Sequence, residues 1–210
     1  MDIIIGQNSK AIAFLRNQDF SKAIEVLSAA LKCLRSLQCA AESKEDRCDE
    51  RRYAHSDCLD QCMLLSKVED ESSFEASRVV FIYGHGISLQ SEVSDADTVT
   101  AILLFNTALA HQMLAIEKQQ YQVLQKARRL YGLAYNSYDM DHNILFRFAV
   151  INNMIVIDQK LGNTAKQNEC LEHLMSLFMV FVDQGCDMHL RHVQGFLVNL
   201  PWTINTALAA

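Results

Sequence analysis

The chain has 210 residues and a formal net charge of −6, with 25 acidic residues against 19 basic ones. One proline and seven glycines are too few for the many tight turns of a β-sandwich or a β-barrel. Half of the residues are hydrophobic and 21% are charged, a composition that argues against global disorder. Length and composition therefore predict a mostly helical globular protein of one domain with an appendage.

The charge and hydropathy patterns predict neither nucleic acid nor a membrane as a partner. Nucleic-acid binding depends on clustered Lys and Arg, and the best basic pair, Arg51-Arg52, has acidic residues around it. The apolar run at 3–5 is too short for a secretory signal. The longest strongly apolar run, 177–182, falls far below the roughly 18 residues of a membrane span. We expect a cytoplasmic protein, with a nuclear location left open, and therefore reduced cysteines.

The first predicted unit is a helical hairpin over residues 8–37, followed by an acidic insertion over 38–78. Apolar and small residues recur at spacings of three and four along the second helix, and Gln18-Asp19 marks the turn. Between residues 42 and 75 there are eleven acidic and five basic residues and few apolar ones. Because such a composition buries little surface, we expect the insertion to be mobile and only partly helical.

Residues 79–200 are expected to complete the same repeat domain. The β-prone run 79–83 precedes Gly84-His85-Gly86, which predicts a short β-strand or hairpin near 79–89. Helical periodicity starts again at Val99, with Asp97 or Thr98 as the expected N-cap. Further breaks are expected near 119–120, 136–143 and 162–163, then a last helix near 188–200 and a tail at 201–210.

Three helical hairpins suggest an internal repeat, because stacked hairpins bury a core that none can bury alone. Small and large residues return at matching offsets in the second helices: Ala23, Leu27 and Ala30; Ala127, Tyr131 and Ala134; and, more loosely, Gln167, Leu171 and Leu174. This pattern resembles the tetratricopeptide repeat, a helix-turn-helix of 34 residues. The early tryptophan and the closing proline of that repeat are missing from all three units.

A likeness to a narrower group covers more of the chain. The order of segments, including the runs 104–111 and 127–131, is similar to that of a large group of tetratricopeptide-like proteins from diatoms. Both resemblances imply an all-α fold, an α-α superhelix of helical hairpins. Neither implies an assigned activity.

The tetratricopeptide resemblance also implies a site, since such arrays bind peptides in a concave groove lined by their first helices. Asn106 and Asn153 stand at equivalent positions of two first helices, where family members place an asparagine that bonds a peptide backbone. Each amide offers donors and an acceptor, which suits an extended ligand, although local capping or packing is the simpler interpretation of Asn153. The peptide-groove candidates are Asn106, Thr107, Ala110, His111, Asn152 and Asn153.

Two Cys/His sets support an alternative function, a metal-binding or redox-responsive regulatory protein. The first set is His55, Cys58 and Cys62, with Cys48 as a possible fourth ligand. The second set is Asp183, Cys186, His189 and His192. Zinc sites favour two pairs of closely spaced ligands, and in the first set only Cys58 and Cys62 are well spaced. The second set recurs every three residues and offers ligands for a divalent metal. Ordinary thiols and surface side chains remain the simpler interpretation of both.

The sequence favours a protein-interaction module over an enzyme. It carries no glycine-rich phosphate loop, no nucleophile elbow and no dinucleotide fingerprint. We therefore expect no catalytic residue, no cofactor and no bound metal. The expected function is that of an adaptor or scaffold that binds a protein or peptide partner on the concave face of the helical stack, with the oligomeric state open.

Overall fold

The computed structural model describes residues 1–42, 81–90, 95–137, 144–183, 195–196 and 199. Within these ranges the chain forms six α-helices and no strand, which confirms the all-α prediction for the described residues. The helices are α1 (Asp2–Arg16), α2 (Phe20–Glu42), α4 (Ala96–Lys118), α5 (Tyr121–Asn136), α6 (Ile144–Leu161) and α7 (Thr164–Asp183).

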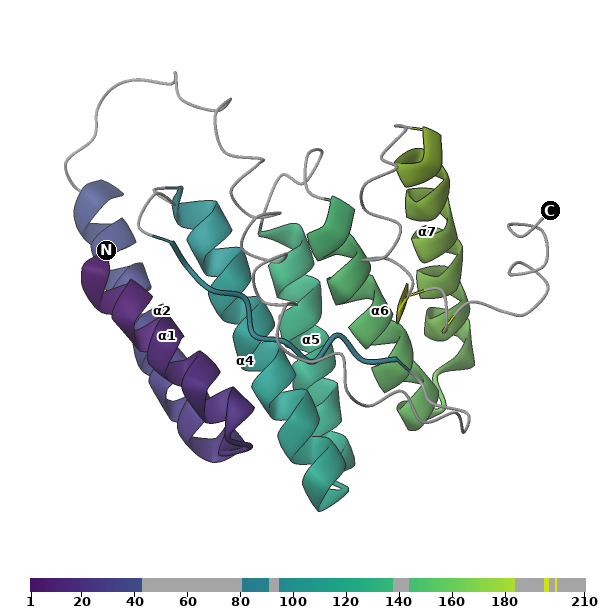
Figure 1. Ribbon diagram of the computed structural model, residues 1–210, viewed down its shortest axis with the longest axis horizontal. Helices are drawn as coiled ribbons and strands as arrows, with labels where there is room; N and C mark the ends of the chain where they lie inside the picture. The colour runs from purple at the N-terminus through teal and green to yellow at the C-terminus, as the bar shows by residue number, and fades with distance from the viewer. Residues whose placement is uncertain (43–80, 91–94, 138–143, 184–194, 197–198, 200–210) are drawn as a thin grey trace.

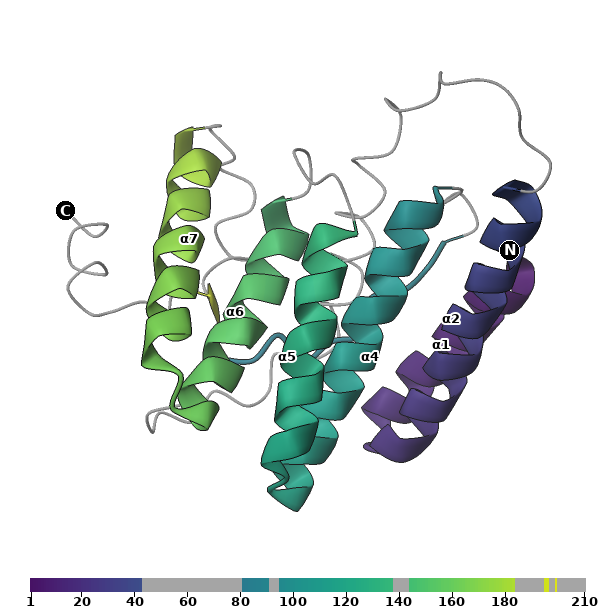
Figure 2. The same ribbon diagram turned by 180° about the vertical axis from the view of Figure 1, so that it is seen from behind.

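Each helix packs against the next one along the chain, from α1 through α7. Figures 1 and 2 show the result as a row of helices with α1 and α2 at one end and α7 at the other. Small residues lie where the helices approach, and they are fully buried, which allows close packing of the backbones. These alanines are Ala11, Ala23, Ala30, Ala108, Ala127 and Ala134.

The three hairpin turns share one backbone conformation. A left-handed residue follows the end of each first helix, directly at Gln119 (φ of 53°) and Gly162 (φ of 71°), and one residue later at Gln18 (φ of 59°). Such a residue commonly ends a helix because it lets the next N–H bond a carbonyl five residues back. Those bonds join Asp19 to Phe14, Gln120 to Ala115 and Asn163 to Asp158, each at 2.9 Å. All three predicted turns are thus present, and only one uses glycine.

Two predicted boundaries are wrong. The first hairpin is predicted over 8–37, yet α1 begins at Asp2 and α2 continues to Glu42. Ile4 is fully buried, so tertiary packing stabilises a first turn that the local pattern does not reveal. The N-cap of α4 is Asp95, whose carboxylate accepts bonds from the backbone N–H of Asp97 and Thr98 at 3.4 and 2.8 Å.

Other expectations fall outside the described residues: the predicted insertion 38–78 beyond Glu42, most of the helix near 188–200, and the tail 201–210. Cys33, Cys39 and Cys170 are described, and all three are free thiols. Among the described helices, α4 alone is long and apolar enough to cross a membrane. The most apolar stretch of α4 is 72% buried inside the protein, as in the core helix of a globular fold.

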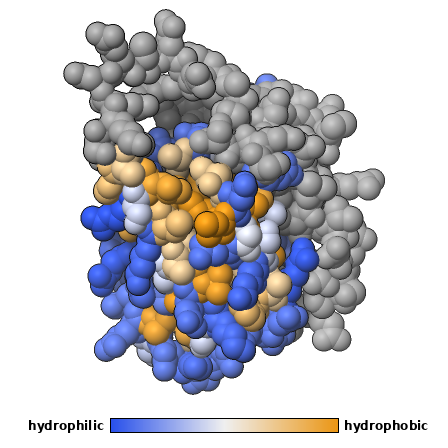
Figure 3. All heavy atoms as spheres, turned by 90° about the vertical axis from the view of Figure 1, so that its left-hand side faces the viewer, coloured by the Kyte–Doolittle hydropathy of each residue, from blue (hydrophilic) through white to orange (hydrophobic). Residues whose placement is uncertain are grey.

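On the outer side of the first hairpin, hydrophilic residues surround several smaller apolar patches (Figure 3). Ile3 and Leu37 are the large apolar side chains of α1 and α2 that are most exposed, at 70% and 47%. Isolated exposure of this kind is ordinary on a protein surface. The buried side of α1 contributes Asn8 to the site described next.

Candidate peptide-binding site

Residues 81–90, here called the inner segment, cross the row of helices as an extended stretch of chain (Figure 1). The β-strand or hairpin predicted near 79–89 is not confirmed, because the described residues of that range have no strand pairing. Instead, the backbones of Phe81, Tyr83 and Ile87 bond side-chain amides. Buried backbone groups must find partners, and here asparagines take the place of a neighbouring strand.

At the α4 end, Asn106 binds both backbone groups of Ile87. Its Oδ1 accepts from the Ile87 N–H at 2.8 Å, and its Nδ2 donates to the Ile87 carbonyl at 2.8 Å. Asn8 of α1 adds a bond from Nδ2 to the same carbonyl at 3.0 Å, and its Oδ1 accepts from Asn106 at 2.8 Å. Both asparagines are fully buried. Two first helices therefore fix one residue of the inner segment.

At the α6 end, Asn153 repeats this arrangement on Tyr83. Its Oδ1 accepts from the Tyr83 N–H at 2.9 Å, and its Nδ2 donates to the Tyr83 carbonyl at 3.0 Å. The same Nδ2 donates to the Tyr131 hydroxyl, which donates to Gln112 Oε1 at 2.8 Å. Burial raises the pKa of Tyr131, so the hydroxyl stays protonated and can donate.

Phe81 is bound in the same way by Asn199. The Asn199 Oδ1 accepts from the Phe81 N–H at 3.0 Å, and its Nδ2 donates to the Phe81 carbonyl at 2.7 Å. Asn152 donates to that carbonyl as well, at 3.0 Å. We call the surface formed by Asn8, Asn106, Asn152, Asn153 and Asn199 the asparagine face.

The inner segment also buries side chains against the helices. Tyr83, Ile87 and Leu89 are 2%, 0% and 3% exposed. The Tyr83 ring lies 6.0 Å from the rings of Phe105 and Phe196, stacked on the latter. Full burial of a side chain of this size stabilises by about 1.5–3 kcal/mol. The segment is therefore held by both backbone bonds and apolar contacts.

Three of the six predicted groove residues, Asn106, Asn152 and Asn153, bond the inner segment. The others have different contacts. The Thr107 hydroxyl donates to the Leu103 carbonyl of its own helix at 2.6 Å, and Ala110 is fully buried. His111 is buried; desolvation and the positive charge of Lys126 lower its pKa to about 4.

Sequence reasoning missed Asn8 and Asn199. A signal for Asn8 exists, because it lies four residues after Ile4 and three before Ala11 on the buried stripe of α1. A lone amide on an apolar stripe requires a buried partner. Asn199 lies far along the chain from its partner Phe81, and no local pattern indicates their contact.

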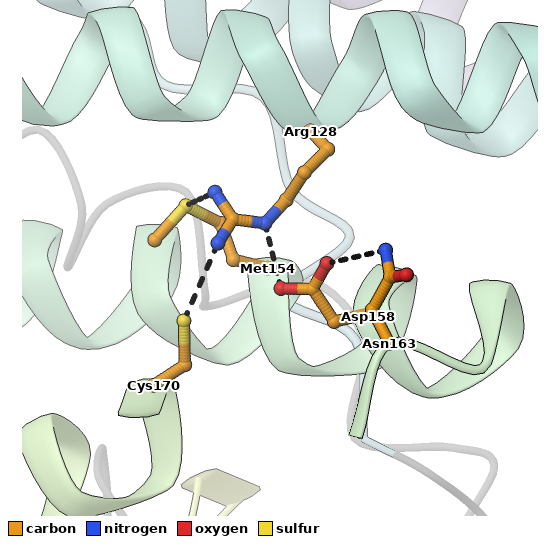
Figure 4. A network of polar contacts seen from close by, with 5 residues as sticks. All are labelled: Arg128, Met154, Asp158, Asn163 and Cys170. Atoms are coloured by element: carbon orange, nitrogen blue, oxygen red, sulfur yellow. Dashed lines mark hydrogen bonds and ion pairs between the residues drawn. The ribbon is translucent and has the colours of Figure 1, made fainter. Parts of the chain in front are cut away.

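A second polar cluster joins α5, α6 and α7 (Figure 4). Arg128 Nε lies 2.7 Å from Oδ2 of Asp158, whose side chain is fully buried. The guanidinium also contacts Met154 Sδ at 2.8 Å and Cys170 Sγ at 3.5 Å. Burial raises the pKa of the Cys170 thiol, an effect that the nearby guanidinium opposes. This Arg128 cluster fixes helices to one another.

No metal site is formed by three or more His, Cys, Asp or Glu side chains within the ranges that the structure describes. Of the two Cys/His sets, Asp183 is described; the seven others lie in 43–80 and 184–194, outside the described residues. No family model, no curated protein and no solved structure matches this chain. The asparagine face is therefore the feature from which we infer a function.

Proposed function

We propose that this chain is a protein-interaction module, an adaptor or scaffold, that binds an extended peptide on the asparagine face. In this proposal the helix row is an α-α superhelix of tetratricopeptide-like hairpins, and the asparagine face is its concave side. One observation carries the proposal. At Ile87, Tyr83 and Phe81, a single asparagine amide bonds both the N–H and the carbonyl of the residue.

The chemistry of this contact suits a binding surface. An amide side chain that bonds both the N–H and the C=O of a residue recognises backbone, which every peptide has. The amides come from α1, α4 and α6 and from Asn199, so the contacts lie along the length of the ligand. Backbone bonds of this kind supply affinity in other extended-peptide complexes, while side-chain pockets supply specificity.

The inner segment is then a ligand bound within its own chain. A partner peptide competes with it for the same amides. Residues 91–94 separate the inner segment from Asp95, so the tether to α4 is short and the effective concentration of the segment is high, in the millimolar range or above. The free protein is therefore expected to bind partners weakly and to bind them tightly once the segment is loosened.

Peptide-display selection against the full chain, read out by NMR, tests this proposal. Selected peptides should shift the side-chain amide signals of Asn106 and Asn153 and should increase hydrogen exchange at the Tyr83 and Ile87 amides, because they displace the segment. An exposed amide on α5, Asn136, serves as the reference signal and should not move. Selected peptides that leave the two buried amides unchanged would show that binding occurs elsewhere.

A further inference from the structure

We propose that the asparagine face selects peptides by a spacing rule: an aromatic residue, glycine three positions later, an aliphatic residue directly after the glycine, and a second aliphatic residue two positions beyond. The rule rests on the proposed function and deepens it by naming the ligand class. The inner segment satisfies it with Tyr83, Gly86, Ile87 and Leu89, and so holds the face closed against other ligands.

The aromatic position follows from the contacts of Tyr83. Its ring stacks on Phe196 at 20° between ring planes, meets Phe105 edge-on, and is 2% exposed. Ring pairs in these geometries stabilise by about 0.5–1.5 kcal/mol beyond the area they bury. Within the described residues the buried Tyr83 hydroxyl has no hydrogen-bond partner. The space that holds Tyr83 therefore suits an aromatic ring, and the hydroxyl adds nothing to binding. Phenylalanine should therefore bind at least as well as tyrosine.

The glycine position follows from the space around Gly86. A Cβ atom there would lie 3.0 Å from Ile12 Cγ1 and 3.1 Å from Leu15 Cδ1, both on α1. Gly84 differs, because the nearest atom to its Cβ would be the Ile82 carbonyl oxygen at 3.9 Å. Neither glycine has the positive φ that disfavours other residues. The requirement at Gly86 is therefore steric, and it is imposed by the helix row.

The aliphatic positions follow from burial. Ile87 is fully buried and Leu89 is 3% exposed, whereas Ser88 between them is only partly buried. Successive side chains of an extended peptide point to opposite sides, so residues two apart face the same surface. The Asn106 bonds to Ile87 set the register, since a shift by one residue would place the polar side chain inward.

The test uses Gly86→Val and Gly84→Val in the full chain. The probe is a fluorescein-labelled peptide with the sequence of residues 81–90, and binding is measured by anisotropy. In Gly86→Val the new methyl groups push the inner segment off α1, so the peptide should bind at least tenfold more tightly than it binds the wild type. Gly84→Val keeps the segment in place and should bind like the wild type. A second peptide, with valine at the position of Gly86, should bind Gly86→Val at least tenfold more weakly than the first.

Hydrogen exchange at the Tyr83 and Ile87 amides shows whether the inner segment has been released. Equal affinity of the two peptides for Gly86→Val would overturn the spacing rule and leave the proposed function intact. Absence of binding by either peptide, with both amides deprotected, would overturn the rule and the proposed function together.

If circular dichroism shows that Gly86→Val loses its helices, the same comparison is made with Gly86→Ala. That variant requires Ile12 and Leu15 to shift by only a few tenths of an ångström. Gly86→Ala should bind the peptide more tightly than the wild type does, by a smaller factor than Gly86→Val. If Gly86→Ala binds the peptide no more tightly than Gly84→Ala does, the rule is overturned.

Discussion

The asparagine face and the Arg128 cluster are two buried polar regions of opposite design. The first is built from neutral amides that bond backbone, and it reaches a segment 70 residues away from Asn153 along the chain. The second is built around an ion pair in which the Asp158 side chain is fully buried and the Arg128 side chain is 23% exposed. Both join distant stretches of the chain.

The difference between the two regions lies in how replaceable the partners are. An amide that bonds backbone accepts almost any residue, and removal of the ligand leaves a neutral group that water can solvate. An ion pair requires its own partner, and removal of one member leaves a buried charge. The asparagine face therefore suits exchange of ligands, whereas the Arg128 cluster suits a permanent connection. Three experiments test this contrast, and a fourth tests the turns of the helical framework that holds both regions.

The largest effect is expected from Arg128→Met, which leaves the Asp158 carboxylate buried without its counter-ion. Loss of one member of a buried pair costs about 3–5 kcal/mol of unfolding free energy. Urea denaturation measures it, with the exposed neighbour Arg129→Met as the matched control. The double variant Arg128→Met/Asp158→Leu should regain most of the loss. A single-variant cost below about 1 kcal/mol would mean that the pair is not an essential connection.

On the asparagine face, Asn153→Leu should be more damaging than Asn106→Leu. The first variant leaves both backbone groups of Tyr83 without their amide, whereas Asn8 still bonds the Ile87 carbonyl in the second. An unpaired buried polar group costs about 1–3 kcal/mol, so we expect about 3 and about 2 kcal/mol. Hydrogen exchange at Tyr83 and Ile87 should report local opening before global unfolding. Exposed Asn136→Leu is the control, and an equal effect in all three variants would contradict the assignment.

The pH dependence separates the neutral face from titrating groups. The pKa of His111 is about 4 in the folded chain, against an ordinary value of 6.5. Between these values the unfolded chain binds more protons, so stability is complete above pH 6.5 and falls as the pH drops toward 4. Allowing for the residual hydration of the ring, we expect a loss of about 2 kcal/mol.

Chemical denaturation of the wild type and His111→Gln between about pH 4 and 7 measures this loss, which the variant should reduce. The pKa of His173 is also lowered, by desolvation and by Arg147, so His173→Gln is the companion variant and should keep most of the pH dependence. A wild-type stability that stays flat over this range would contradict the burial of a neutral His111.

The smallest effect concerns the turns. Gln119 adopts φ of 53°, a conformation that costs a residue other than glycine about 1 kcal/mol. Gln119→Gly should raise the unfolding free energy by about 0.5–1 kcal/mol. Gly162→Ala, at φ of 71°, should lower it by a similar amount. Thermal unfolding compares the two, and a change of the same sign in both would show that the turn conformations are not equivalent.

Much of the helical framework could be predicted from local pattern. The turns at Gln18-Asp19, Gln119-Gln120 and Gly162-Asn163 lie where helical periodicity breaks, and the small residues Ala127 and Ala134 are buried as expected of a hairpin crossing. The tetratricopeptide resemblance implies that Asn106 and Asn153 bond the backbone of a peptide ligand; in the structure they bond the backbone of Ile87 and Tyr83 of the same chain. Periodicity is a property of neighbouring residues, so it is visible without the fold.

The partner of those asparagines could not be predicted from the sequence. The run 81–83 has the composition of a β-strand, and only its position against α6 shows that side-chain amides replace a paired strand. Asn8 and Asn199 join the face through contacts across 79 and 118 residues. Composition, periodicity and turn chemistry determined by themselves that this chain forms helical hairpins. Tertiary structure alone decided what lies on the asparagine face, because that depends on which buried polar groups the packed helices leave within bonding distance.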